Sequence, residues 1–172
     1  MNGEHDMLDE LHPNFIHQVL PNGKPSAVLE RRGVAVFREE QPEFTYDSFN
    51  VDDPVIGGYT PERVALRRAL VHAHDRTQEI DIIRKQQALP AQSPVPPGIV
   101  GYDPAFRAPA TEYDSAKAKA LLDMFGYVDR DGDGWREQPD GSALELKANS
   151  TPTARDQQID ELWKRSMDDI GI

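Results

Sequence analysis

The sequence predicts an α/β fold in which helices pack on a small mixed sheet. Three amphipathic helices are expected, at residues 60–73, 114–126 and 153–170. Segments rich in β-branched, aromatic or alternating apolar residues are expected to be strands, at residues 34–37, 44–49 and 143–148. The last helix runs into Gly171 and Ile172, and a helix followed by glycine and an apolar residue typically leads into a strand in α/β architecture.

The composition is acidic and free of cysteine. Nineteen lysines and arginines against 30 aspartates and glutamates give the 172 residues a formal net charge of −11. This charge opposes binding to nucleic acid or to an anionic membrane surface. Without cysteine, neither a disulfide nor a cysteine-based zinc site can form. No run approaches the roughly 18 apolar residues of a membrane span, and the length suits a single domain over residues 1–172.

The N-terminal half carries helical patterns and the first predicted strands. Apolar residues at helical spacings within residues 4–20 predict a helix that Pro13 divides. Pro42, between the first two strands, favours an edge position or a break. The Thr-Pro-Glu sequence at residues 60–62 is a typical helix start, with a cap, a proline at the first helical position and an acid near the positive end of the dipole. Another helix is expected at residues 77–87.

The C-terminal half begins with a strap at residues 88–109. Its many prolines exclude regular structure and predict a stiff, extended segment whose apolar side chains pack across a neighbouring surface. Asp114 is expected to cap the next helix, and Gly126 to end it. Thr153 and Asp156 resemble a capping box at the start of the last helix, with aspartate in place of glutamate.

An acidic loop that begins at Asp129 has the spacing of a calcium-binding loop. Asp129, Asp131 and Asp133 occupy loop positions 1, 3 and 5. In a calcium site, Trp135 would add its backbone carbonyl and Asp140 would close the loop at position 12. An EF-hand has glutamate at that position and continues into a helix, whereas this loop leads into a predicted strand. Asp-Gly pairs also form turns, so the loop is interpreted either as a calcium site or as a helix-to-strand turn.

A second candidate site is the loop that joins the predicted strand at residues 143–148 to the last helix. In open α/β sheets ligands bind at such loops, and the free N–H groups at a helix start favour anionic or carbonyl oxygens. The same serines and threonines also suit an ordinary helix cap, which is the alternative interpretation. The predicted ligand-binding residues are Asn149, Ser150, Thr151, Thr153, Arg155 and, as a neighbour, Asn50.

Catalytic motifs are absent from the sequence. It contains no Gly-rich phosphate loop, no Gly-x-Ser-x-Gly elbow and no His-Glu-x-x-His helix, and it lacks a cysteine nucleophile. His72 and His74 lie two residues apart on a predicted helix, so they point to different sides and cannot bind one metal together. They are interpreted as surface or half-buried side chains, and no catalytic residue is assigned.

A series of short segments runs along nearly the whole chain, at residues 49–50, 53–54, 63–69, 91–98, 101–102, 113–114, 116–122, 126–127, 131–135, 162–164 and 170–172. They include Arg63-Val-Ala-Leu-Arg-Arg-Ala69, Ala91-Gln-Ser-Pro-Val-Pro-Pro-Gly98 and Ala116-Lys-Ala-Lys-Ala-Leu-Leu122. No single segment is specific. In this order and spacing, however, they resemble the extracellular solute-binding proteins of family 5, the dipeptide and oligopeptide receptors of ABC importers.

This resemblance implies one lobe of a two-lobed, periplasmic-binding-protein type II-like fold, with the chain as part of a longer protein whose export signal lies elsewhere. It implies the substrate-binding component of an ABC importer, which captures peptides or similar small solutes in the periplasm and contacts ABC permease subunits. It implies neither an enzyme nor a required cofactor. The alternative functions are a calcium-binding structural module built on the acidic loop and an enzyme fragment.

Overall fold

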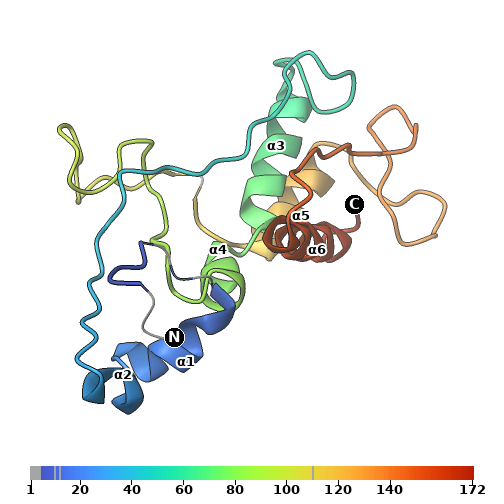
Figure 1. Cartoon of the computed structure of the whole chain (residues 1–172). Coiled ribbons are helices and arrows are strands. Elements are labelled where there is room, and N and C mark those ends of the chain that lie inside the picture. The colour runs from blue at the N-terminus through green and yellow to red at the C-terminus, as the bar shows by residue number, and fades with distance from the viewer. Residues whose placement is uncertain (1–4, 10, 12, 110) are drawn as a thin grey trace.

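Three helices form the centre of the computed structural model, which describes residues 5–9, 11, 13–109 and 111–172, and long loops leave this centre on several sides (Figure 1). The helices are α3 (Pro61–Ala73), α5 (Ser115–Met124) and α6 (Ala154–Asp168). Each lies within a range predicted from the sequence, so these three helices are confirmed. No helix among the described residues is long and apolar enough to cross a membrane.

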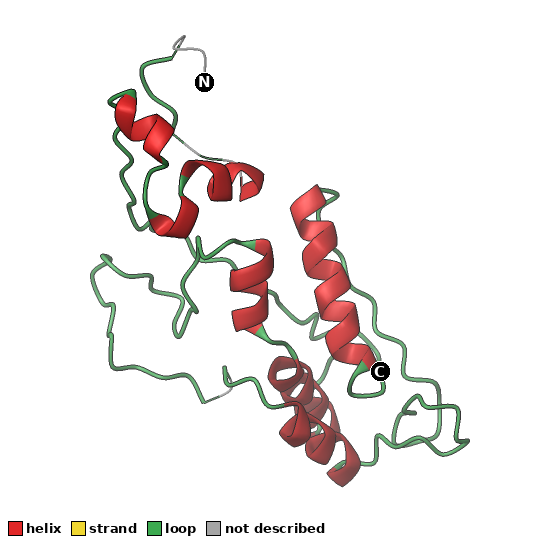
Figure 2. Cartoon of the chain, turned by 90° about the horizontal axis from the view of Figure 1, so that it is seen from below, coloured by secondary structure: helices red, strands yellow, loops and turns green. Residues whose placement is uncertain are grey.

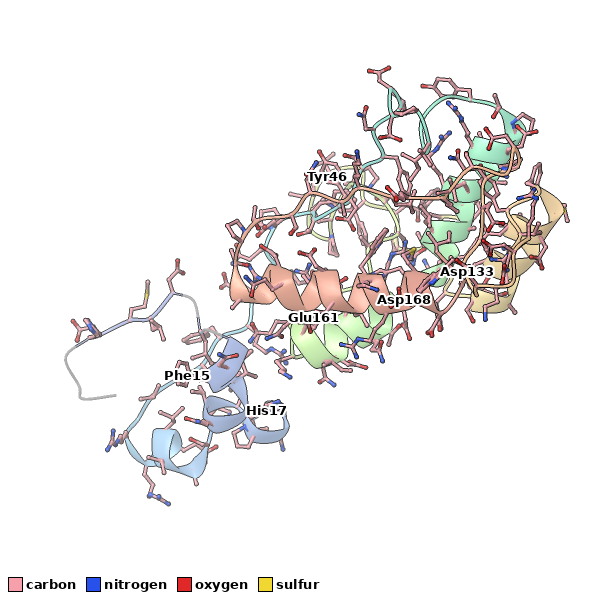
Figure 3. All side chains as sticks on the ribbon, turned by 90° about the vertical axis from the view of Figure 1, so that its right-hand side faces the viewer. Phe15, His17, Tyr46, Asp133, Glu161 and Asp168 are labelled. Carbon is pink, nitrogen blue, oxygen red and sulfur yellow. The ribbon has the colours of Figure 1, made fainter. Side chains whose placement is uncertain are left out.

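The N-terminal part forms short helical turns, namely η1 (Pro13–Phe15), α1 (Ile16–Val19), η2 (Pro21–Gly23) and α2 (Ala27–Arg31). Figures 1 and 3 show this part to one side of the three central helices. Its buried apolar residues are Ile16, Leu20 and Leu29. Of the helix predicted over residues 4–20, only the part from Pro13 onwards is helical; residues 4, 10 and 12 lie outside the described residues.

The loop before α3 is fixed by an aspartate and by two arginines of the helix. The Asp53 carboxylate accepts a hydrogen bond from the Ile56 N–H at 3.0 Å, and this bond is the main cause that lowers the pKa of Asp53. Arg63 donates to the carbonyl of Pro54 (2.6 Å), and Arg67 donates to that of Ile56 (2.6 Å). The loop is therefore held against the first turns of α3.

The hydrophobic core lies where α3, α5 and the end of α6 meet. Ala69 and Ala118 have no exposed surface, and their small side chains let α3 and α5 pack closely. Leu66 and Leu122 are equally buried and belong to the same core. The buried residues of the core are Leu66, Ala69, Leu70, Ala73, Ala118, Leu122, Tyr127, Met167 and Ile170.

The predicted sheet is absent from the described residues, so the prediction of helices on a small mixed sheet is wrong. These residues form helices and loops (Figure 2). One isolated antiparallel bridge joins Glu137 and Ala143. Leu144 and Leu146 pack against the core while the residues after each of them are exposed, which is the alternation expected of a strand. A strand also needs a partner for its backbone hydrogen bonds, and no described segment bonds to residues 144–148 in this way.

The two N-terminal strand predictions fail for the same reason. Residues 34–37 and 44–49 belong to an open segment that runs towards α3 (Figure 1). The rings of Phe44 and Tyr46 stack with centroids 5.6 Å apart, so alternate side chains share one side of the chain as they would in a strand. Alternation of side chains can therefore arise within a single segment, whereas a β-strand also needs backbone hydrogen bonds to a second segment.

The helix predicted at residues 77–87 is replaced by two short turns. The turn α4 (Arg76–Gln78) leads directly into η3 (Glu79–Ile83), which has π-helical geometry. Lys85 and Gln86 then take positive φ angles of 51° and 60°, which end the helical path. A left-handed backbone is unfavourable for residues with a side chain, so sequence periodicity does not predict this early end.

A partly buried polar cluster links the end of α3 to η3 and the residue that follows it. His74 Nε2 lies 3.0 Å from Glu79 Oε2, and Arg84 Nε donates to Glu79 Oε1 at 2.7 Å. His72 is also buried, and its Nδ1 lies 2.8 Å from the carbonyl oxygen of Glu112. Both histidines are therefore interior side chains rather than the surface or half-buried ones predicted from the sequence.

The pKa of Glu79 lies below its ordinary value of 4.5, chiefly because of the hydrogen bond with His74 and also because of Arg84. A lowered carboxyl pKa contributes stability above pH 4.5, and this contribution is lost as the pH falls through the lowered value. We expect Glu79→Gln to reduce the free energy of unfolding by about 1–3 kcal/mol at neutral pH, and by much less in acid.

Urea unfolding of the wild type and of Glu79→Gln, at neutral pH and in acid below the lowered pKa of Glu79, measures the change in unfolding free energy at each pH. The exposed neighbour Asp81, replaced by asparagine, is the matched control and should change stability little at either pH. An effect of Glu79→Gln that is the same at both pH values would contradict the prediction.

The strap at residues 88–109 contains neither helix nor strand, as predicted, but it packs less than expected. Val100 is completely exposed, and Tyr102 and Phe106 are also exposed. Val95 is half-buried. Within the described residues, the predicted packing of the strap across a neighbouring surface is therefore only partly realised.

Candidate functional site

The polar loop before α6 acts as a helix cap. Thr153 Oγ1 accepts from the N–H of Asp156 (3.1 Å) and donates to its Oδ2 (2.7 Å). Thr151 also donates to the Asp156 carboxylate, and Ser150 donates to that of Asp160. The hydrogen bonds from Thr151 and then Thr153 lower the pKa of Asp156. Three of the loop residues predicted to bind a ligand are thus already bonded to the helix.

Two predicted residues of this loop have side chains that remain available to a ligand. Asn149 and Arg155 are exposed, and their side chains form no hydrogen bond or ion pair with the described residues. They flank the start of α6, where the first N–H groups have no acceptor within the helix. After the threonine hydroxyls, the charges of Arg155 and Arg84 also lower the pKa of Asp156. Arg84 is therefore a cationic neighbour that was not predicted, because it lies far from the loop in sequence.

Asn50 forms no hydrogen bond with this loop within the described part of the chain. Its side-chain oxygen accepts from the N–H of Asp52 at 3.1 Å. Lys147, just before the polar loop, adds its charge to the backbone hydrogen bonds that lower the pKa of Asp53. The described structure therefore does not join Asn50 to the polar loop by a hydrogen bond.

The acidic loop gathers four carboxylates. Oxygens of Asp129, Asp131, Asp133 and Glu137 lie within 4.8 Å of one another. Asp140, the predicted closing residue, lies outside this group. Glu137 was not predicted, although it occupies loop position 9, which is a ligand position in calcium loops. The structure therefore brings together three of the four predicted aspartates and adds a glutamate.

The aspartates of this loop also accept hydrogen bonds from its backbone. Asp129 accepts from the N–H groups of Gly132 (2.7 Å) and Gly134 (2.9 Å). The next two aspartates each accept from the N–H two residues further on, at 3.1 and 2.8 Å. Asp140 accepts from the hydroxyl and then the N–H of Ser142, and these bonds lower its pKa. This is the turn chemistry of the alternative interpretation.

Calcium binding by this loop stays a prediction of the sequence. A cation that binds only the folded state stabilises it, so millimolar calcium is expected to raise the melting temperature if the carboxylates hold it. Asp129→Asn should then remove the shift, and magnesium at the same concentration controls for ionic strength. A melting temperature that calcium leaves unchanged would assign the loop to turn formation alone.

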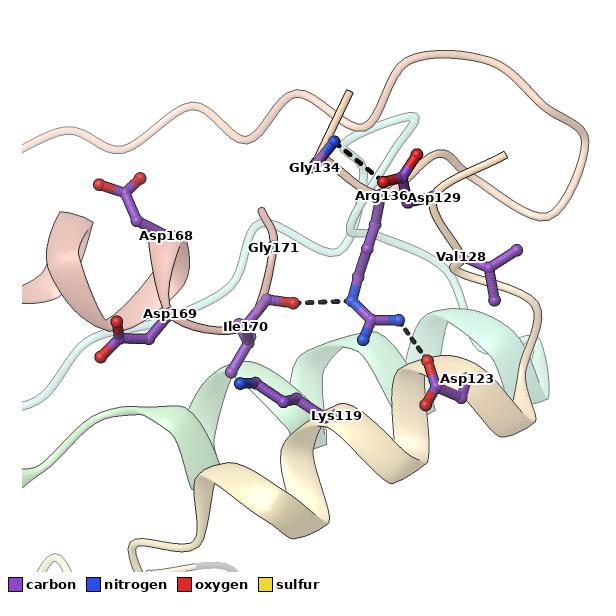
Figure 4. A pocket seen from close by; sticks show the side chains of 10 residues that line it. All are labelled: Lys119, Asp123, Val128, Asp129, Gly134, Arg136, Asp168, Asp169, Ile170 and Gly171. Carbon is purple, nitrogen blue, oxygen red and sulfur yellow. Dashed lines mark hydrogen bonds and ion pairs between the residues drawn. The ribbon is translucent and has the colours of Figure 1, made fainter. Parts of the chain in front are cut away.

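Arg136 joins the acidic loop to the helical core (Figure 4). Its Nε donates to the carbonyl of Ile170 (2.7 Å), and Nη1 lies 2.5 Å from both the Asp123 carboxylate and the carbonyl of Tyr127. Its backbone N–H donates to the carbonyl of Gly171 at 2.8 Å. Arg136, Asp123, Ile170 and Gly171 border a depression of about 500 Å³ beside the end of α6. A single arginine beside an acidic loop has no distinctive spacing, so Arg136 was not predicted.

The polar loop at the start of α6 is thus exposed, with Arg155 in the first turn of the helix. The family model for the middle region of bacterial extracellular solute-binding proteins, family 5, matches residues 1–172. The chain belongs to this family. The family predicted from the order and spacing of the short sequence segments is therefore confirmed.

Solved oligopeptide-binding proteins share this fold. The oligopeptide-binding protein AppA of Bacillus subtilis, solved with a nonapeptide, has 26% identity and a TM-score of 0.55 over 63% of this chain and 21% of its own. A periplasmic oligopeptide-binding protein of Thermotoga maritima has 22% identity and a TM-score of 0.61 over 96% of this chain and 34% of its own. Its mannohexaose-bound structure has 23% identity and a TM-score of 0.55, with 69% and 23% covered. No curated protein is a significant match.

Proposed function

We propose that the chain is part of the substrate-binding component of an ABC importer, which captures peptides or similar small solutes outside the cytoplasmic membrane. The match of the family 5 model to residues 1–172 carries this proposal. The neighbour solved with a nonapeptide supports a peptide ligand, and the one solved with mannohexaose supports a wider range of solutes. The family and these neighbours are binding proteins, so we expect no catalytic activity.

The setting of this function is also a proposal. We place the protein in the periplasm, where it would pass its ligand to the permease subunits of the importer. The chain spans no more than 34% of the length of these neighbours, and a second lobe is proposed to complete the site. A ligand on half a cleft stays solvated on one face, so the chain alone should bind peptides much more weakly than a complete binding protein.

The proposed ligand contacts on this chain are Asn149 and Arg155. The Arg155 guanidinium is free to bind a ligand carboxylate through two parallel hydrogen bonds, a geometry that lysine cannot copy. Thr153 acts indirectly, because its hydroxyl holds the first turn of α6, on which Arg155 lies.

Peptide affinity in a complete binding protein that includes this chain tests the loop. Arg155→Lys is expected to weaken binding about tenfold or more, which corresponds to the loss of about 1.4 kcal/mol or more from one charged hydrogen bond. Titration calorimetry with a mixed peptide library measures this. Arg165→Lys, an exposed change on the same helix, is the control. Unchanged affinity in both Arg155→Lys and Thr153→Ala would remove the loop from the site.

A further inference from the structure

The acidic loop contains two peptide bonds that are prone to a spontaneous chemical change. Asp131 precedes Gly132, and Asp133 precedes Gly134. Glycine has no side chain to hinder its nitrogen and allows the backbone to bend freely, so aspartyl–glycyl bonds are the easiest to close into a ring. Both bonds are exposed to solvent. Their chemistry is separate from any role of the carboxylates as metal ligands.

The reaction is an internal condensation followed by hydrolysis. The aspartate carboxylate first takes a proton from solvent. The glycine nitrogen then forms a bond to Cγ of this aspartate, and the carboxyl OH leaves with the proton of the N–H as water. Water then opens the five-membered succinimide. Cleavage of the bond from Cγ to nitrogen restores aspartate, whereas cleavage of the original backbone bond gives isoaspartate. Mass is unchanged, and no oxidant or cofactor takes part.

The nitrogens of both glycines, which would have to attack, already donate their protons in hydrogen bonds to the Asp129 carboxylate. Its Oδ1 accepts from the N–H of Gly132 at 2.7 Å, and its Oδ2 accepts from the N–H of Gly134 at 2.9 Å. A nitrogen whose proton is shared with Asp129 points away from its own aspartate. The fixed negative charge also opposes loss of that proton, because an anionic nitrogen would form beside a carboxylate.

The attacked carboxyl groups are held as well. Asp131 accepts from the N–H of Asp133 at 3.1 Å, and Asp133 accepts from the N–H of Trp135 at 2.8 Å. Each carboxyl group is thus turned towards the nitrogen two residues on rather than towards the adjacent glycine. Ring closure would have to break these bonds together with those to Asp129.

We propose that Asp131 and Asp133 are sites of spontaneous isomerisation to isoaspartate, and that Asp129 protects both bonds while the loop is folded. Isoaspartate adds one carbon to the backbone path. The loop between Asp129 and Arg136 would then lengthen, and Arg136 would no longer be held in register with the end of α6.

Ageing of the folded chain at neutral pH tests this proposal. Isoaspartate is measured at each position by digestion and by chromatography with fragment mass spectrometry. A synthetic peptide of residues 128–138 supplies the unprotected rate. The wild-type chain should isomerise at Asp131 and Asp133 more slowly than the peptide. Asp129→Ala should raise the rates at both positions towards that of the peptide, because the bonds from Asp129 are lost while those to the attacked carboxyl groups remain.

The chain contains its own reference in Asp140, which precedes Gly141. The N–H of Gly141 donates to the carbonyl of Gln138 at 2.8 Å, so Asp129→Ala should leave isomerisation at Asp140 unchanged. The exposed Asp169→Ala controls for the loss of one negative charge. Isomerisation of the wild type at the rate of the peptide, or an unchanged rate in Asp129→Ala, would overturn the proposal.

A second variant keeps the test decisive if Asp129→Ala does not fold. An asparagine side chain at position 129 has one oxygen that can accept a hydrogen bond, whereas its amide nitrogen can only donate one. Asp129→Asn should therefore release only one of the two glycine N–H groups and accelerate isomerisation at one position. Equal rates in Asp129→Asn and the wild type at both positions would again contradict protection by Asp129.

Discussion

Replacing Leu122 by alanine is expected to lower the free energy of unfolding by about 2–5 kcal/mol. Leu122 has no exposed surface and packs in the core shared by α3, α5 and the end of α6. The substitution removes apolar surface from the core and leaves a cavity, since the surrounding helices can only partly collapse into it. Urea unfolding followed by circular dichroism measures the change.

Met124 on the same helix is the matched control for Leu122. Its side chain is 74% exposed, so Met124→Ala should change stability by no more than about 0.5 kcal/mol. Equal effects of the two substitutions would show that α5 does not bury the face described above.

Replacing Arg136 by methionine should cost about 2–4 kcal/mol of unfolding free energy. Only 14% of the Arg136 side chain is exposed. Methionine keeps much of its volume but leaves the carbonyls of Tyr127 and Ile170 without their donor. The acidic loop would also lose its side-chain connection to the core.

Arg68, an exposed arginine of α3, provides the control for this substitution, because Arg68→Met removes the same charge without breaking a hydrogen bond of the described structure. Hydrogen exchange then separates local from global effects. Amides of residues 129–136 should lose protection in Arg136→Met and keep it in Arg68→Met. Full protection of the loop in Arg136→Met would exclude Arg136 as its anchor.

Helix positions were the most predictable part of the fold, because their determinants are local. Pro61 begins α3 where the sequence predicts, Asp114 caps α5 through the N–H of Lys117 (2.8 Å), and Thr153 caps α6. Each cap needs only residues within one turn of the helix. Residues 79–87 were less predictable, since a π-helical turn is followed there by positive φ angles at Lys85 and Gln86, which side-chain periodicity does not indicate.

The candidate sites were predictable in position but only partly in composition. The residues of the polar loop are adjacent in sequence, so their place at the start of α6 follows from the cap. Arg84 joins them from a distant turn, and Arg136 reaches the carbonyls of Tyr127 and Ile170. Glu137 replaces Asp140 in the carboxylate group because backbone turns decide which oxygens meet. Spacing along the sequence does not predict the distances between these residues in the folded chain.

The sequence by itself determined the family, the three main helices, the acidic character of the chain and the position of both candidate loops. These features depend on composition, on periodicity within one segment and on the order of short segments. Only the tertiary structure decided that residues 143–148 pair with no other strand, that His72 and His74 are buried, and that Arg136 anchors the acidic loop. Strand pairing, burial and long-range hydrogen bonds each need a second segment of the chain. Which distant segment lies close enough is set by the tertiary fold and not by local sequence.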